Sequence, residues 1–509
     1  MNQRKAGILL SYVNTALNGI TMLVYVPMLL HYLTKEQYGV YQLMGSLIAA
    51  LSLMDFGLGS CIVRFLAQAR ARQNVKEEQD ILSAARLLYL LIAGAILVVG
   101  AGLYIGITPL YGKTLSPQEL VCAKQIFIIL LVNFALVIAC NVFSVVMLAR
   151  ERFVAYQGIR VLDLVCSPLM VWGVLSWKAD VLNIVWVQTF FNILVIGISY
   201  IYCRVKLQVH FPLYRVPGAL IRKLAAFSLT IFIGNVSGQI YWRLGSWVLG
   251  AIAGAVAVAN YYISSQICLF FLIFSSSIGS VFLPKLSADS AKSVSLQSHN
   301  EIFCRTGRLQ ALIACLILIG FVCLGREFLT LWLGPGNEVC YWPAVILMAG
   351  YMLSVIQGIA PTALQAMNRY SWFAYIYLAS AGCNILLAFV LSKYYGVIGC
   401  ALAAAFCLLV LQGLAVNIYY NRVGLDVRHF IREVAPIIIS SVLVWLGLWG
   451  LGTVWPVQTS WTSFMLHGVV IVMVYVVVMC RFVLNPFEWT VLNECWQFIT
   501  SFGRKGLTE

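Results

Sequence analysis

The sequence predicts an all-α polytopic membrane protein with about fourteen transmembrane helices, arranged as two six-helix lobes followed by two further helices. Three observations lead to this prediction: the hydropathy of the chain, the distribution of its basic residues and an internal repeat. Of the 509 residues, 62% are hydrophobic and only 10% are charged, and the mean hydropathy is +0.91. Soluble multidomain proteins do not combine such values, so we expect the chain to fold in a bilayer.

Apolar stretches long enough to cross a bilayer recur along the whole chain. They fall at residues 8–33, 39–63, 85–107, 122–148, 157–177, 181–203, 224–250, 257–283, 306–331, 342–366, 372–392, 397–420, 434–454 and 464–484. The connections on the predicted outer side are short, the longest lying near 108–121 and 332–341. They leave no room for an extracytoplasmic domain.

The basic residues are distributed asymmetrically about these spans. Of the 33 lysines and arginines, only six fall in predicted outer segments, and Arg243 alone lies inside a span. The six are Lys35, Lys113, Lys124, Lys178, Arg326 and Lys393. By the positive-inside rule, both termini are expected in the cytoplasm, with the chain in the bacterial cytoplasmic (inner) membrane. The net charge of +15 is thereby explained without a nucleic-acid partner.

Local patterns recur in the two halves of the chain at an offset of 216 to 221 residues. Asn14 and Asn18 correspond to Asn235 and Gln239, and Arg152 corresponds to Arg369. An offset of six helices preserves orientation, so we expect parallel repeats related by a pseudo-twofold axis along the membrane normal. The predicted segments are a lobe at 1–203, a linker at 204–223, a lobe at 224–420, two added helices at 421–484 and a cytoplasmic tail at 485–509.

The linker carries Pro212 and Pro217 among basic and aromatic residues. This composition suits an amphipathic segment at the level of the lipid headgroups. A solvated linker is an equally open interpretation.

Arg243 ends a polar stripe in the seventh span. Asn235, Gln239 and Arg243 are spaced by four residues and therefore share one helical face. An arginine in the hydrocarbon costs about 2.5 to 3.5 kcal/mol on insertion scales unless it faces protein, water or an anion. From its depth of roughly 24 Å at 1.5 Å per residue, we expect it in the outer half of the span. It either snorkels to the outer interface or binds a phosphate.

The first span carries a similar polar stripe, in which residues step by three or four. The stripe consists of Ser11, Asn14, Asn18, Thr21 and Tyr25. Polar residues between transmembrane helices serve either as interhelical hydrogen bonds worth about 0.6 to 2 kcal/mol or as the lining of a hydrophilic cavity. We expect such a cavity between the lobes, with Asn14, Asn18, Asn235 and Gln239 binding sugar hydroxyls and Arg243 binding an anion.

Asp55 is the clearest acidic residue that the pattern places inside a span. We expect it near the cytoplasmic side, about 18 Å in depth from Arg243, which argues against a direct ion pair. It is either a protonatable coupling group or, beside Gly57 and Gly59, a structural residue at a helix break.

No enzyme constellation is recognisable. The five histidines are scattered, and no zinc-protease or serine-hydrolase motif occurs. The 15 cysteines show no metal-ligand spacing and are expected to be small apolar fillers. We therefore expect a transporter without cofactor or metal rather than an enzyme.

The segment Leu33–Tyr41, followed by Asp55-Phe56-Gly57-Leu58 and Arg64, resembles the bacterial Wzx-type polysaccharide exporters. These are oligosaccharide flippases of the multidrug/oligosaccharidyl-lipid/polysaccharide superfamily. The resemblance implies the superfamily fold, shared with multidrug exporters. It also implies translocation of an undecaprenyl-pyrophosphate-linked oligosaccharide from the cytoplasmic to the periplasmic leaflet, for O-antigen, capsule or exopolysaccharide assembly.

Related branches of the superfamily remain alternatives. Proton-coupled multidrug exporters rely on an acidic residue in the first span, and lipid II flippases usually carry charges there, whereas residues 8–33 contain no acid and their interior is uncharged. A membrane polysaccharide polymerase or ligase would need a substantial outer loop.

An alternating-access flippase is therefore expected. Its partners would be the lipid-linked oligosaccharide and membrane lipids, while proton or sodium coupling and contact with the polysaccharide assembly machinery stay open. Arg64, Arg152 and Arg369 are the residues expected at its cytoplasmic entrance.

Overall fold

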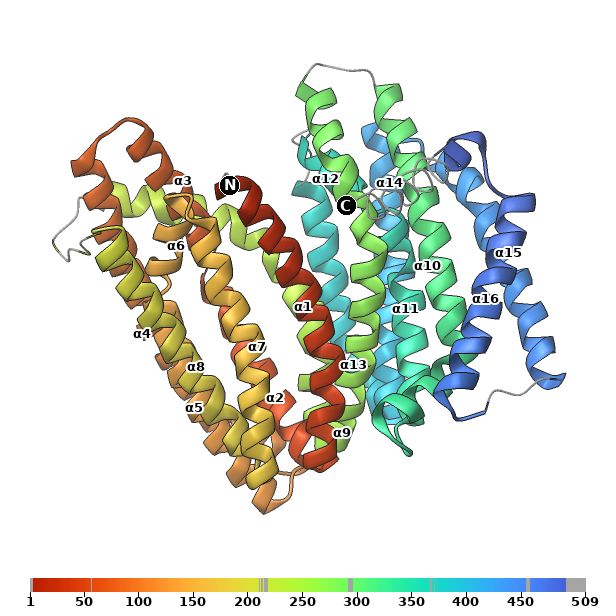
Figure 1. The fold of residues 1–509 in the computed structure, drawn as a ribbon, viewed down its shortest axis with the longest axis horizontal. Coiled ribbons are helices and arrows are strands. Elements are labelled where there is room, and N and C mark those ends of the chain that lie inside the picture. The colour runs from red at the N-terminus through yellow and green to blue at the C-terminus, as the bar shows by residue number, and fades with distance from the viewer. Residues whose placement is uncertain are drawn as a thin grey trace, which may run out of the picture. The chain divides into compact units, whose positions relative to one another are not determined.

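A computed structural model describes residues 3–490, apart from positions 56, 210, 212–213, 215–217, 292–295, 367–368, 370 and 455–457. Side chains are described in these ranges except at 4–5, 8–9, 12, 219, 223, 225–240, 274–291, 296–299, 362, 365–366 and 451–454. The described residues form helices joined by short connections and include no β-strand. Figure 1 shows the helices and their labels.

Two glycines decide how many spans the chain has. Twelve stretches of the described residues are long and apolar enough to cross a membrane. Two of these, Tyr241–Ile273 and Ser371–Val423, are interrupted by Gly254 with φ +80° and Gly396 with φ +54°. Glycine adopts positive φ without the steric penalty that a side chain would bring. Each glycine thus separates two spans, and the predicted multi-pass protein with about fourteen spans is confirmed.

The chain divides into two compact units. The first consists of Met1–Ile263 and Ala381–Ala403, and the second of Ser264–Ser380 and Ala404–Glu509. The first unit includes residues beyond 224, which the sequence pattern assigns to the second lobe. The lobe and linker boundaries drawn from the sequence remain a prediction.

The first unit begins with helices in chain order. They are α1 Gln3–Tyr32, α2 Lys35–Leu51, the 3₁₀ helix η1 Ser52–Asp55, α3 Leu58–Ala71, α4 Val75–Tyr111, α5 Pro117–Ala139, α6 Val142–Ala149, α7 Phe153–Trp177, α8 Val181–Ile201 and the π-helical turn η2 Tyr202–Lys206. The long helix α9 Gly218–Ala291 follows, broken at Gly254. Capping boxes start α2 at Thr34 and α5 at Ser116. There the side-chain hydroxyl accepts a hydrogen bond from a backbone N–H group of the first helical turn that would otherwise be unpaired.

The remaining elements continue to the end of the described chain. They are α10 Leu296–Leu333, η3 Glu338–Cys340, α11 Tyr341–Ile356, α12 Ala360–Ala366, α13 Ser371–Phe406, the π-helical η4 Cys407–Gln412, α14 Gly413–Val423, α15 Val427–Val454 and α16 Trp461–Phe482. The appended helices α15 and α16 both pack on α10. The ring of Phe303 on α10 stacks on that of Phe430 on α15, with the ring centroids 4.3 Å apart. The hydroxyl of Tyr475 on α16 donates a hydrogen bond of 2.8 Å to the carbonyl of Leu312 on α10.

Helix breaks at repeat-related positions support the internal repeat. The helix formed by α5 and α6 breaks at Cys140–Asn141, and the one formed by α11 and α12 breaks at Gln357–Gly358. Asn141 and Gly358 are 217 residues apart, within the predicted offset. Asn141 donates to Tyr89 of α4 at 3.3 Å, while Gly358 approaches Gln310 of α10. Both breaks thus contact the preceding long helix.

The described part of the linker is fastened to the first unit. Arg150 donates to the Leu207 carbonyl at 2.8 Å, and Arg86 donates to the Phe211 carbonyl at 2.5 Å. The hydroxyl of Tyr214 donates to Asp80 at 2.5 Å. The described linker residues are therefore held by side chains at the ends of α4 and α6, which neither sequence interpretation anticipated.

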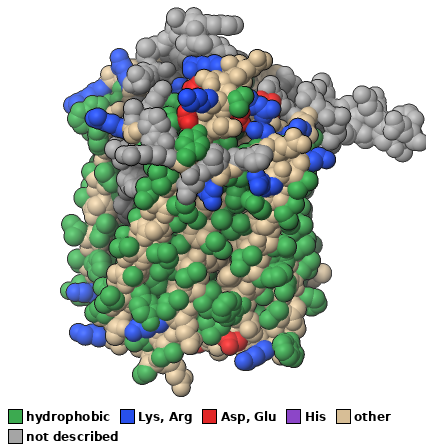
Figure 2. All heavy atoms as spheres, turned by 90° about the vertical axis from the view of Figure 1, so that its left-hand side faces the viewer, with side chains coloured by type: hydrophobic (Ala, Val, Ile, Leu, Met, Phe, Trp, Pro, Cys, Tyr) green, Lys and Arg blue, Asp and Glu red, His purple; other side chains and the backbone are tan. Residues whose placement is uncertain are grey.

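Side chains on the face of the first unit separate by polarity. Figure 2 shows a broad band of hydrophobic side chains between two rims that carry the lysines and arginines. Large apolar residues such as Val98, Ile105 and Leu169 are 60–75% exposed in this unit. Such a surface is stable only against lipid acyl chains.

Candidate functional site

Arg243 lies on α9, partly exposed, eleven residues before the break at Gly254. At 1.5 Å per residue it is roughly 16 Å from that break, close to the middle of a hydrocarbon layer about 30 Å thick. This depth weighs against the snorkelling interpretation. The Nε of Arg243 is buried and has no hydrogen-bond partner, and the side chain makes no ion pair with any residue that the structure describes.

Trp247 lies one turn further along the same face of α9. Its indole Nε1 is also buried without an acceptor. A buried donor left without a partner costs about 1 to 3 kcal/mol. Two such donors at i and i+4 make this face of α9 suited to a ligand with acceptor oxygens.

The predicted polar stripe of α1 divides into two parts. Asn14 donates to Gln157 of α7, with Nδ2 at 2.5 Å from the side-chain Oε1 and at 3.2 Å from the carbonyl. Asn14 thus makes the interhelical hydrogen bond that was the structural alternative. Asn18, one turn later, is exposed and lines a cavity. The side chains of Asn235 and Gln239 lie outside the described residues.

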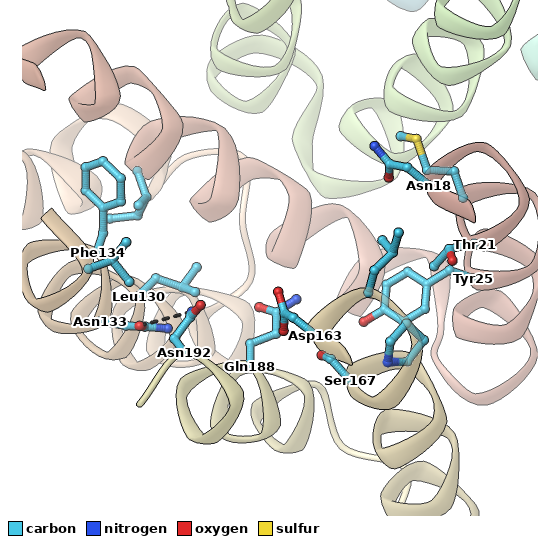
Figure 3. Close-up of a pocket in the computed structure, with 15 residues that line it drawn as sticks. Asn18, Thr21, Tyr25, Leu130, Asn133, Phe134, Asp163, Ser167, Gln188 and Asn192 are labelled. Carbon is cyan, nitrogen blue, oxygen red and sulfur yellow. Dashed lines mark hydrogen bonds between the residues drawn. The ribbon is translucent and has the colours of Figure 1, made fainter. Parts of the chain in front are cut away.

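The cavity lies inside the first unit and has a volume of about 490 Å³. Helices α1, α2, α5, α7 and α8 form its walls, and Asn18, Thr21 and Tyr25 of α1 contribute one of them. Figure 3 shows Asp163 and Ser167 of α7 beside Gln188 of α8. Because this cavity belongs to one unit, the cavity predicted between the lobes stays a prediction.

Hydrogen bonds between neighbouring helices fix two walls of this cavity. Asn192 of α8 donates to Asn133 of α5 at 3.2 Å, and Asn133 donates to Thr189 of α8 at 3.3 Å. Gln188 donates to the hydroxyl of Tyr41 on α2 at 2.6 Å. These bonds hold the carboxamides in place before any ligand arrives.

The residues on α7 and α8 were missed by the sequence analysis, which singled out Asp55 as the acidic residue of a span. Asp163 stands ten residues into α7 and is equally intramembrane. The signal was present, because Asp163 and Ser167 on α7, and Gln188 and Asn192 on α8, repeat the four-residue spacing that identified the other stripes.

Asp55 lies at a helix break, away from the cavity. It ends η1, two residues before Gly57 with φ +68°. Its Oδ1 is buried without a hydrogen bond among the described residues, and the carboxylate interacts electrostatically with Tyr89. This position favours the structural interpretation, while a coupling role stays a prediction.

The three arginines expected at the cytoplasmic entrance are all exposed. Arg64 lies on α3 and Arg152 precedes α7, both in the first unit. Arg369 lies in the second unit, where its carbonyl accepts a hydrogen bond from Tyr419 at 2.7 Å. Their shared role at an entrance stays a prediction. Within the described ranges, no group of three or more histidine, cysteine or acidic side chains could hold a metal ion.

Comparison with known proteins places the chain in a family. The profile of the family described as polysaccharide biosynthesis protein matches residues 4–288, more than half of the sequence. The chain belongs to this family. The resemblance noted from the segments around Gly39 and Asp55 is thereby confirmed.

Two curated relatives are similar to the chain at low identity. A Shigella flexneri protein named putative O-antigen transporter is 22% identical over 403 residues, covering 77% of this chain and 91% of the relative. A Haloferax volcanii protein named probable low-salt glycan biosynthesis flippase Agl15 is 19% identical over 232 residues, covering 46% of this chain. The latter match spans about half of the relative, 48% of its length.

Solved structures show the same fold. A lipid II flippase, MurJ, in an inward closed conformation superposes with a TM-score of 0.72 at 15% identity, over 92% of this chain and 98% of that one. An inward-facing multidrug resistance transporter of the MATE family and MOP superfamily superposes with a TM-score of 0.66 at 11% identity, over 80% of this chain and 94% of that one. The predicted fold of two six-helix lobes with two added helices is therefore confirmed.

Proposed function

We propose that the protein is a flippase that moves an undecaprenyl-pyrophosphate-linked oligosaccharide from the cytoplasmic to the periplasmic leaflet of the bacterial inner membrane. The cargo would feed O-antigen, capsule or exopolysaccharide assembly. Membership of a polysaccharide biosynthesis family supports this function, as do relatives named as an O-antigen transporter and a glycan flippase. The lobes alternate the access of one site to the two sides of the membrane.

The observation that carries the proposal is the intramembrane cation Arg243. It has a buried Nε without a partner and no carboxylate paired with it among the described residues. A guanidinium stays charged at any physiological pH and binds phosphate oxygens through two parallel hydrogen bonds. The diphosphate of the cargo is the anion that fits such a group, and the polyprenyl tail stays in the lipid.

Export of surface polysaccharide tests this assignment. Arg243→Ala and Arg243→Glu should each lower export by roughly ten- to a hundredfold, the effect of losing charged hydrogen bonds worth about 1.5 to 3 kcal/mol. Arg243→Lys should be intermediate, because an ammonium lacks the planar fork. Export is measured in a flippase-deficient strain, together with the amount of each variant in the membrane.

Arg326→Ala is the matched control, because Arg326 lies over the Tyr341 ring in the second unit, at the predicted outer rim. It should leave export unchanged. Normal export by both Arg243→Ala and Arg243→Glu would refute the phosphate assignment.

A proton or sodium gradient drives the cycle in this proposal, and the flippase hands its cargo to polysaccharide assembly machinery on the outer side. Proteoliposomes that transport equally well after the gradient is collapsed would contradict the coupling.

The second candidate is an exporter of small cationic molecules with the same fold. The specific observation in its favour is Asp163, a carboxylate in an intramembrane cavity, since acids attract cationic drugs. Efflux of a cationic dye that depends on Asp163 but not on Arg243 would favour this function.

A polymerase or ligase fits the fold less well. Within the described residues, the connections between helices on the predicted outer side are 33–34, 112–116, 178–180, 334–337 and 458–460. These segments are too short to carry a catalytic domain.

A further inference from the structure

The lining of the cavity in the first unit suits neither the diphosphate nor the polyprenyl chain of the proposed cargo. Among the residues that the structure describes, its lining contains one carboxylate, Asp163, and no lysine or arginine. A diphosphate would meet a like charge there in a low-dielectric environment. A polyprenyl chain would leave the polar groups of Asn18, Thr21 and Ser167 buried without partners. Both the anionic and the apolar parts of a lipid-linked sugar are therefore disfavoured in this cavity.

Several polar groups of the lining are unused. Asn18, Thr21, Asp163 and Ser167 make no hydrogen bond with any residue that the structure describes. They are partly or fully accessible rather than sealed, and they come from α1 and α7 on two walls. Together they offer two hydroxyls, one carboxamide and one carboxylate, so the wall presents both donors and acceptors.

A sugar ring requires this mixture of groups. Each hydroxyl of a pyranose donates one hydrogen bond and accepts others, and neighbouring hydroxyls can be held together by one carboxylate or one carboxamide. The pre-oriented amides of Gln188 and Asn192 add further capacity. Tyr25 and Phe134, which also line the cavity, offer apolar ring surface to the C–H face of a sugar.

The size of the cavity distinguishes a sugar from an ion. Its volume of about 490 Å³ lies within the roughly 300 to 1,000 Å³ that small-molecule sites occupy. A water molecule takes only about 30 Å³ in the liquid, and a bare cation with its ligands needs a space of that order. The volume and the many neutral hydrogen-bonding groups favour a molecule of sugar size.

We propose that this cavity is a saccharide subsite, which binds a pyranose unit of the cargo while Arg243 binds the diphosphate. Asp163, Ser167 and Thr21 contact sugar hydroxyls, and the carboxamides of Gln188 and Asn192 orient the ring. The inference rests on the proposed flippase function and adds that recognition of the sugar is separated from recognition of the phosphate.

Binding measurements with two ligands test whether the sugar and the diphosphate are recognised by separate sites. The full-length protein in nanodiscs is titrated with lipid-linked oligosaccharide extracted from a host strain that lacks this gene, and with undecaprenyl diphosphate as the sugar-free ligand. The wild type should bind the sugar-bearing lipid at least about tenfold more tightly, the effect of one or two hydrogen bonds. Arg243→Ala should lower the affinity for both ligands.

Three variants address the subsite directly. Ser167→Phe, which fills the cavity, should reduce the affinity for the sugar-bearing lipid to that for the sugar-free lipid. Thr21→Val, which keeps the shape of the side chain and removes its hydroxyl, should lower the affinity for the sugar-bearing lipid several-fold. Asp163→Asn should have the same effect. All three should leave the affinity for undecaprenyl diphosphate unchanged, which also shows that the variants are folded.

Thr15→Val is the matched control for Thr21→Val. Thr15 lies on the same helix and is exposed, and its hydroxyl donates to the carbonyl of Ser11. It is not among the described residues that line the cavity. It should bind both lipids as the wild type does.

Three other outcomes are distinguishable. Equal wild-type affinity for the two lipids, or no effect of Ser167→Phe, would refute the saccharide subsite and leave the flippase function standing. Failure of the wild type to bind either lipid would refute the flippase function itself. Sodium binding that Asp163→Asn abolishes, with unchanged affinity for the sugar-bearing lipid, would identify a cation site and overturn the proposal.

Discussion

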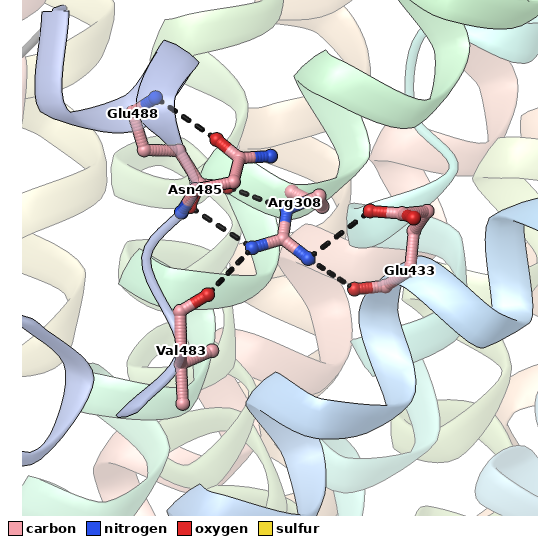
Figure 4. A network of polar contacts seen from close by, with 5 residues as sticks. All are labelled: Arg308, Glu433, Val483, Asn485 and Glu488. Atoms are coloured by element: carbon pink, nitrogen blue, oxygen red, sulfur yellow. Dashed lines mark hydrogen bonds and ion pairs between the residues drawn. The ribbon is translucent and has the colours of Figure 1, made fainter. Parts of the chain in front are cut away.

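The guanidinium of Arg308 and the carboxylate of Glu488 form a two-pronged ion pair, with distances of 2.6 Å for Nε–Oε1 and 2.9 Å for Nη2–Oε2. Figure 4 shows that Arg308 also reaches Glu433 and Val483, whose carbonyls lie at 2.5 and 3.0 Å. The exposed fractions of the two side chains are only 6% and 1%. One residue of α10 thus holds α15 and the segment that follows α16.

Removing either partner of this buried pair should destabilise the second unit. Arg308→Ala leaves the Glu488 carboxylate buried without a cation, whereas Glu488→Ala leaves the guanidinium with Glu433, whose side chain is 38% exposed, as its remaining ion-pair partner. Arg308→Ala should cost about 3 to 5 kcal/mol, seen as a large drop in the midpoint of thermal unfolding in detergent, and Glu488→Ala should cost less than Arg308→Ala. The double variant with leucine at both positions should recover much of the loss, because no buried charge remains.

Glu301→Gln is the comparison for this experiment. Glu301 pairs with Arg305 at 3.4 Å, but both side chains are about half exposed. Its loss should change stability by at most about 1 kcal/mol. Equal effects of Glu301→Gln and Glu488→Ala would contradict the role assigned to burial.

Gly39 on α2 packs directly against the backbone of α9 in the first unit. A Cβ at this position would overlap the carbonyl oxygen of Ala255. Gly39→Ala should therefore push two helices apart and cost about 1 to 3 kcal/mol, the usual effect of overpacking. The loss should appear in the thermal unfolding of the purified protein.

Gly45 is the matched control on the same helix, because a Cβ there would meet nothing within 4 Å. Gly45→Ala should be neutral or stabilising by about 0.5 to 1 kcal/mol, since alanine is the better helix former. A stabilising effect of Gly39→Ala would show that the two helices are not packed as described.

Tyr214 anchors the linker through its hydrogen bond to Asp80. This bond to a carboxylate raises the pKa of Tyr214 from its ordinary value of 10.0 to about 12. Because the pKa is raised in the folded protein, the stabilisation is complete below pH 10 and is lost as the pH rises through about 12.

The absorbance of ionised tyrosine measures this shift. The difference in absorbance between the wild type and Tyr214→Phe, followed as the pH is raised, should show one tyrosine that ionises near pH 12. In Asp80→Ala the same difference should move towards pH 10, because the carboxylate is gone. A midpoint near pH 10 in the presence of Asp80 would contradict the hydrogen bond.

The sequence by itself determined the class of the protein, the number of spans and the internal repeat. Hydropathy is a local property, so each span could be recognised from its own residues, and Gly254 and Gly396 end spans where the apolar stretches end. The polar spacing on α1 and α9 was equally visible, because residues four apart share a helical face whatever the helix packs against.

Only the tertiary structure decided which polar residues come together. Asn18 and Asn192 are 174 residues apart and line one cavity because α1 packs on α7 and α7 packs on α8. Arg308 and Glu488 lie 180 residues apart, and no local pattern marks them as partners. Helix packing depends on the fit of side chains from distant segments, which the periodicity of a single helix does not contain.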